Sequence, residues 1–97
     1  MVRKSIADEV IEGLEDFEDS EGPFIVTYDF ARKEGKSIHH SFWRNLNRLF
    51  IKLGDGKRVQ LSVMECQRLK TATAIKVLAE RFKARDVIIY RVERLKT

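Results

Sequence analysis

Residues 24–30 read Phe-Ile-Val-Thr-Tyr-Asp-Phe, and this stretch decides the fold class. Its β-branched and aromatic side chains are typical of a strand, and the apolar run before the aspartate is typical of a strand buried inside a sheet. We therefore predict a buried central strand here. A basic segment, residues 31–36, follows it directly.

An amphipathic helix is predicted after the basic segment. It begins near Ser37 and ends at Gly54, because glycine commonly follows the last turn of a helix. The apolar residues on its inner face are Ile38, Phe42, Leu46, Leu49, Phe50 and Leu53.

The second half of the chain predicts further strands and one more helix. Apolar and polar residues alternate over 57–66, and the stretch to Leu69 is long enough for a strand, a tight bend and a short return strand. Thr71 or Thr73 caps a helix, and residues 86–93 form a final strand. The order predicts an α+β protein with a ferredoxin-like βαββαβ domain, in which two helices back an antiparallel or mixed sheet.

The charge is distributed unevenly along the chain. Residues 5–22 contain eight acids and no base, whereas residues 23–97 contain 17 bases and 7 acids. Apolar residues in the acidic part recur at helical spacing behind Ser5, a good N-cap, and Pro23 ends the pattern. We therefore expect an acidic, amphipathic N-terminal helical extension, residues 1–22, in front of a ferredoxin-like domain, residues 23–97.

The composition restricts the classes of function. A chain of 97 residues supports one small domain and excludes a large enzyme pocket enclosed by one subunit. No apolar run approaches the roughly 20 residues of a membrane span, and no apolar signal-peptide region follows the N-terminus. The single cysteine, Cys66, excludes an internal disulfide. We expect a cytoplasmic protein that contacts no membrane.

Nucleophilic catalysis and a conventional metal site are poorly supported. Glu65 beside Cys66 raises the pKa of the thiol and so disfavours the reactive thiolate. His39 and His40 are adjacent near a helix start and point about 100° apart, so they are poorly placed to chelate one metal ion.

Asp29 is the residue most suggestive of chemistry. It ends the apolar strand beside Arg32 and Lys33, where a carboxylate can bind a hard cation such as Mg²⁺. One carboxylate is too few for a metal site, but a twofold dimer brings two together, and a nucleic-acid phosphate supplies more oxygens. The same residues also allow a structural role, in which Asp29 accepts backbone amides or pairs with Arg32.

The basic residues of the second part favour binding to RNA or DNA, because a strongly basic domain attracts phosphates. The residues that we expect to bind nucleic acid are Arg32, Lys33, Lys36, Arg44 and Arg58. A surface rich in Lys and Glu is also common in heat-adapted proteins, and the chain has only two Asn and two Gln. A thermophilic source is therefore an alternative explanation of the charge.

Two stretches together resemble a known family. Val26-Thr27-Tyr28-Asp29 is similar to the first strand of the small CRISPR-associated adaptation proteins, the Cas-two family. Residues 58–66, Arg-Val-Gln-Leu-Ser-Val-Met-Glu-Cys, resemble the Arg-Val-Gln-x-Ser-Val-Phe-Glu strand pair of that family. The VapD toxin-related ribonucleases have a similar Gln-x-Ser segment. The resemblance covers about residues 24–93, and Ser62 matches the motif.

The resemblance implies a ferredoxin-like fold and a homodimer packed through its sheets. In family members described as nucleases, the aspartate that corresponds to Asp29 comes from both subunits to hold a divalent metal. This implies a Mg²⁺-dependent endonuclease. In the spacer-integration complex, the same dimer is instead a non-catalytic scaffold for duplex DNA.

Two further interpretations remain open. The protein could be a non-enzymatic interaction module whose acidic helix masks a basic face of its own or of the partner subunit, or binds a protein partner. It could also be a dimeric structural domain without a nucleic-acid role.

Overall fold

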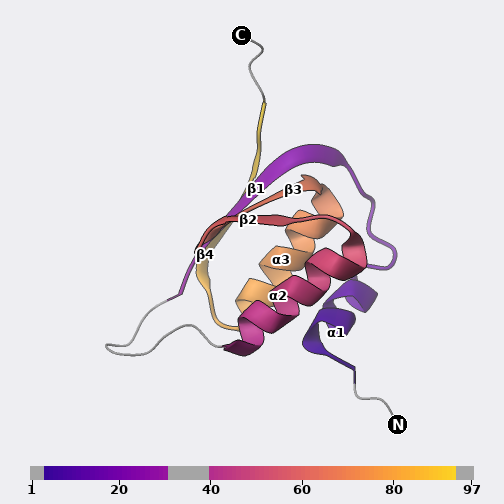
Figure 1. Ribbon diagram of the computed structural model, residues 1–97. Coiled ribbons are helices and arrows are strands. Elements are labelled where there is room, and N and C mark those ends of the chain that lie inside the picture. Colours follow the sequence, from indigo (N-terminus) through magenta and orange to yellow (C-terminus); the bar gives the residue numbers. More distant parts are fainter. Residues whose placement is uncertain (1–3, 31–39, 94–97) are drawn as a thin grey trace.

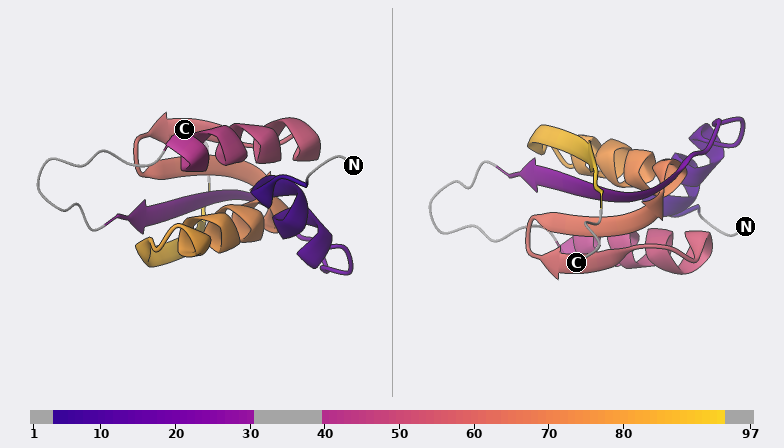
Figure 2. Two further views of the ribbon diagram at one scale, coloured as in Figure 1. Left: turned by 90° about the horizontal axis from the view of Figure 1, so that it is seen from below. Right: turned by 90° about the horizontal axis from the view of Figure 1, so that it is seen from above.

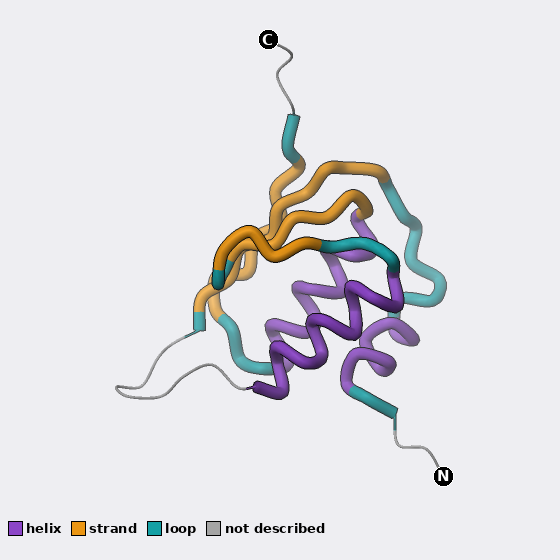
Figure 3. Tube along the Cα trace, viewed as in Figure 1, coloured by secondary structure: helices purple, strands orange, loops and turns teal. Residues whose placement is uncertain are grey.

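The computed structural model describes residues 4–30 and 40–93, which form three helices and one four-stranded sheet (Figures 1 and 3). The elements in chain order are α1 (Ile6–Gly13), β1 (Glu21–Asp29), α2 (His40–Leu53), β2 (Lys57–Gln60), β3 (Val63–Arg68), α3 (Leu69–Arg81) and β4 (Arg85–Arg91). All strand pairs are antiparallel, in the order β2-β3-β1-β4. The α+β class is thus confirmed, and the arrangement is compatible with a ferredoxin-like fold.

The stretch that opened the sequence analysis is the inner strand β1, between β3 and β4. Its burial alternates, because Phe24, Val26 and Tyr28 face the helices while Ile25 and Thr27 lie on the other face. Figures 1 and 2 show the helices on one side of the curved sheet. The main core therefore lies between one face of the sheet and the helices.

The first helix is shorter than the sequence pattern predicts. Ser5 and Asp8 form the capping box at its start, but the helix ends at Gly13 instead of continuing past Leu14 to Phe17. Glycine is a poor helix former, and the acids that follow it disfavour a helix C-terminus, where the dipole is negative. α1 packs on α2 and α3 and buries Ala7 and Val10 in the common core.

Two other boundaries differ from the predictions, and a third is not tested. β1 begins at Glu21, before Pro23, because the pairing with β3 is irregular between Glu21 and Phe24 and tolerates the missing amide. α3 begins at Leu69 and not after a threonine cap, since the Asp19 carboxylate accepts from the amide of Lys70. The predicted helix start near Ser37 lies outside the described residues.

Among the described residues, no helix combines the length and the apolar character that crossing a membrane requires.

Candidate nucleic-acid interface

One end of the sheet carries Asp29, the residue that the sequence marks as most suggestive of chemistry. β1 ends there at Asp29, and Arg85 at the start of β4 lies opposite it. Figure 2 shows the start of α2 and the turn between β2 and β3 at the same end as the tip of β1. We refer to this part of the molecule as the Asp29 end.

Asp29 is exposed at this end, and none of the other described residues forms an ion pair with it. The strand pairing with β4 shifts by one residue here, and Asp86, with a φ of 51°, occupies the shift. The described residues contain no group of three or more side chains that could together hold a metal ion. Within the described part of one chain, Asp29 therefore belongs to no group of three or more side chains that could hold a cation.

Tyr28 fixes the turn between β2 and β3 beside Asp29. Its hydroxyl donates to the carbonyl oxygen of Leu61 over 3.0 Å, and its amide donates to the carbonyl of Ser62 over 3.3 Å. Burial raises the pKa of the Tyr28 hydroxyl, and the nearby charge of Arg58 opposes this only in part. The phenol therefore stays protonated and acts as a structural donor, while Ser62 is exposed in the turn.

Arg58 extends from β2 to α2. It lies opposite the buried Met64 of β3, so its side chain is on the helix side of the sheet. Its guanidinium carbon lies 5.2 Å from the centre of the Trp43 ring, within the range of a cation–π interaction. The packing of Trp43 against Phe42, at 5.1 Å between ring centres, continues this contact into the core.

The other predicted nucleic-acid ligands divide into two groups. Arg44 is exposed on α2, one residue from Trp43. The basic segment with Arg32, Lys33 and Lys36 lies outside the described residues. Arg58 thus contacts α2 through Trp43, and Arg44 follows Trp43 in the same helix, pointing about 100° away from it.

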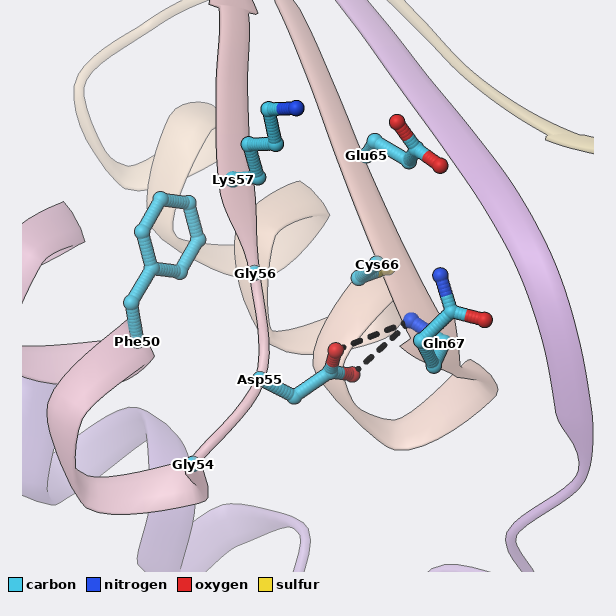
Figure 4. A pocket seen from close by; sticks show the side chains of 8 residues that line it. All are labelled: Phe50, Gly54, Asp55, Gly56, Lys57, Glu65, Cys66 and Gln67. Carbon is cyan, nitrogen blue, oxygen red and sulfur yellow. Dashed lines mark hydrogen bonds between the residues drawn. The ribbon is translucent and has the colours of Figure 1, made fainter.

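A shallow pocket lies away from the Asp29 end, between the turn after α2 and strand β3 (Figure 4). Both oxygens of Asp55 accept from the amide of Gln67, and one also accepts from the amide of Arg68. Burial, followed by the Asp55 and Glu65 carboxylates, raises the pKa of the Cys66 thiol to about 12. The pocket thus contains a protonated thiol and a carboxylate already engaged by the backbone, which argues against nucleophilic catalysis there.

Two residues, Trp43 and Arg85, were not predicted from the sequence to belong to the site. Trp43 lies within the helix predicted from Ser37 to Gly54, but it is not among the apolar residues that define its inner face. Arg85 preceded the predicted final strand. The proximity of Trp43 to Arg44 in sequence was a usable signal, whereas the positions of Arg58 and Arg85 depend on strand register.

No protein-family model matches the chain, and the comparisons with curated proteins and with solved structures also give no match. The resemblance to the Cas-two family and the VapD-type ribonucleases therefore depends on the two short motifs.

Proposed function

We propose that the protein is a homodimeric, nucleic-acid-binding protein similar to the Cas-two and VapD types. In this proposal residues 23–97 form a ferredoxin-like domain, and residues 1–22 form its acidic N-terminal extension. One observation supports the proposal most directly: Arg44, Arg58 and Arg85 are exposed without an ion-pair partner among the described residues, and Arg85 lies opposite Asp29 in the strand pairing. Cations that remain unpaired on a surface attract phosphates.

The open face of the sheet supports the dimer. Ile25 and Thr27 of β1 lie there beside Tyr90 and Ile88 of β4, and the last two side chains are 48% and 43% exposed. A second copy that covers this face would bury these apolar groups.

The dimer is tested by sedimentation equilibrium of the wild type and Ile88→Glu. We expect the substitution to produce a monomer, because it places a charge in the apolar interface. Ile51→Glu is the matched control, since Ile51 is 79% exposed on α2, away from this face. A monomeric wild type would contradict the proposed dimer.

The enzymatic part of the proposal concerns Asp29. Two copies of this carboxylate, one from each subunit, would hold Mg²⁺, and the metal would neutralise a phosphate and orient water for cleavage of RNA or DNA. The exposure of Asp29 at the end of β1 supports this role.

The test is a Mg²⁺-dependent nuclease assay on RNA and on DNA. We expect cleavage by the wild type, loss of cleavage with Asp29→Ala, and full cleavage with Glu80→Gln, which changes an exposed carboxylate on α3. Equal activity of the Asp29→Ala variant would exclude the mechanism. If the wild type bound nucleic acid but did not cleave it, the enzymatic part of the proposal would be excluded and a non-catalytic scaffold function would remain.

The contacts of α1 favour a second candidate function, an interaction module in which the acidic helix masks basic residues. Asp8 pairs with Lys52 of α2, and Glu9 lies 2.9 Å from Arg81 of α3. The exposed acids that follow the helix, Glu15, Asp16 and Glu18, form no ion pair with another described residue and remain available to a protein partner.

Charge variants test the masking better than a deletion, because α1 contributes Ala7 and Val10 to the core. Asp8→Asn should release Lys52 and strengthen binding to an oligonucleotide, with a steeper salt dependence. Glu15→Gln, at an exposed position after α1, is the control. Unchanged affinity of the Asp8→Asn variant would argue against masking.

A further inference from the structure

The part of the chain from α2 to the start of β3 has almost no acidic surface. Residues 40–64, here named the α2–β2 unit, contain the five bases Arg44, Arg48, Lys52, Lys57 and Arg58 and one acid, Asp55. The side chain of Asp55 is only 8% exposed, and its oxygens accept backbone amides of β3. The surface of this unit therefore carries positive charge without an exposed carboxylate.

Two arginines on α2 provide the charge that faces water. Lys52 is already paired with Asp8, whereas Arg44 and Arg48 are exposed and have no ion-pair partner among the described residues. They are separated by four positions and so lie on the same face of the helix, one turn apart. Asn47, also exposed, adds a hydrogen-bonding side chain to this face.

Arg58 adds a third cation from the neighbouring strand. Its guanidinium lies over the Trp43 ring, and this cation–π contact restricts the side chain in advance. Because Arg58 is exposed, its N–H groups can donate to an anionic acceptor in solvent. The entropic cost of binding a phosphate is therefore lower than for a mobile arginine.

We propose that the sugar–phosphate backbone of a nucleic acid binds along the outer face of α2, with Arg44, Arg48 and Arg58 as phosphate ligands. Trp43 is then a positioning residue that acts through Arg58. This inference rests on the proposed function, since it takes nucleic acid as the ligand. The contact uses phosphates and not stacked bases, because Phe42 is buried and Trp43 and Phe50 are half-buried. Binding is therefore independent of base sequence and sensitive to salt.

The experiment is a fluorescence-anisotropy titration of the full chain with labelled DNA and RNA duplexes, repeated at several salt concentrations. Arg44→Ala, Arg48→Ala and Arg58→Ala should each weaken binding about fivefold and reduce the slope of log K against log salt by about 0.9. Lys76→Ala is the matched control, because it removes the same charge from α3, outside the α2–β2 unit. We expect a much smaller effect from this control.

The role of Trp43 is tested by a double-mutant cycle with Arg58. Trp43→Leu should weaken binding as much as Arg58→Ala does, and it should have no further effect in the Arg58→Ala background. Trp43→Phe keeps an aromatic ring beneath Arg58 and should retain most of the wild-type affinity for the oligonucleotide. Thermal unfolding confirms that each variant folds, and Trp43→Phe decides the question if Trp43→Leu does not fold.

The outcomes separate this inference from the proposed function. A wild type that binds neither duplex at low salt would overturn both. A wild type that binds, together with arginine variants that behave like Lys76→Ala, would overturn the α2 surface and leave the nucleic-acid function intact. Additive effects of Trp43→Leu and Arg58→Ala would overturn the positioning role, and affinities that differ among duplexes of different sequence would overturn recognition through phosphates alone.

Discussion

The two ends of the sheet hold their charged side chains in opposite ways. Where β3 passes into α3, Arg68 donates to the carbonyl of Leu53 and lies 3.9 Å from a carboxylate oxygen of both Asp19 and Asp55. At the Asp29 end, the exposed Arg85 has no ion-pair partner among the described residues. Charges that satisfy backbone groups stabilise the fold, whereas charges left in water contribute little to it. The Arg68 end is therefore structural, and the Asp29 end is available for binding.

The largest expected difference between the two ends is in stability. Asp55→Ala removes the acceptor of the Gln67 and Arg68 amides and should lower the free energy of unfolding by about 2–3 kcal/mol. Asp29→Ala should change it by less than about 0.5 kcal/mol, because that carboxylate is exposed. Urea denaturation of both variants measures the contrast. Equal destabilisation would remove the distinction between the two ends.

A smaller effect is expected at Thr71, in the first turn of α3 near the Arg68 end. Its hydroxyl is buried and has no hydrogen-bond partner among the described residues. Thr71→Val keeps the shape and removes the unsatisfied group, so it should stabilise the protein by about 1 kcal/mol. Thr73→Val, at a half-buried position of the same helix, is the control in thermal unfolding. Destabilisation by Thr71→Val would mean that its hydroxyl has a partner in solution.

The smallest effect concerns pH. Burial acts to raise the pKa of Asp19, but the amides of Lys70 and Ser20 and the charges of Arg68 and Lys70 outweigh it and lower the pKa. The folded pKa therefore lies below the unfolded value of 3.8, so the stabilisation is present above about pH 4 and is lost as pH falls through the folded value. Asp19→Asn should lower stability modestly at pH 7 and flatten its decline in acid, measured by urea titrations. If the stability of Asp19→Asn declined in acid as steeply as that of the wild type, the Asp19 carboxylate would not contribute to the pH dependence.

Much of the fold could be predicted because its signals are local. The β-branched and aromatic composition of β1 predicts a strand. The apolar residues of α2, such as Phe42, Leu46 and Leu49, recur at helical spacing and predict a helix. The end of α1 and the start of α3 could not be predicted in this way. The start of α3 depends on Asp19, whose carboxylate accepts a hydrogen bond from the amide of Lys70, 51 residues away in the chain.

The candidate site was predictable only in part. Asp29 and Arg44 could be selected from residue type and from position next to a strand end or on a helix. The contact between Arg58 and Trp43 could not be predicted from the sequence. It requires the pairing of Arg58 with Met64 and the irregular register that follows it in β2. One residue of slippage in that strand would place Arg58 on the opposite face of the sheet.

The position of β1 between two strands that follow much later in the chain also affects how the protein is made. β1 pairs with β4, whose residues 85–91 are synthesised about 60 residues after Asp29. At 5–20 residues per second this interval lasts roughly 3–12 s. During that time Phe24 to Tyr28, a β-forming and apolar segment, has one edge without its native partner. The strand that lies inside the finished sheet is thus exposed to aggregation during synthesis.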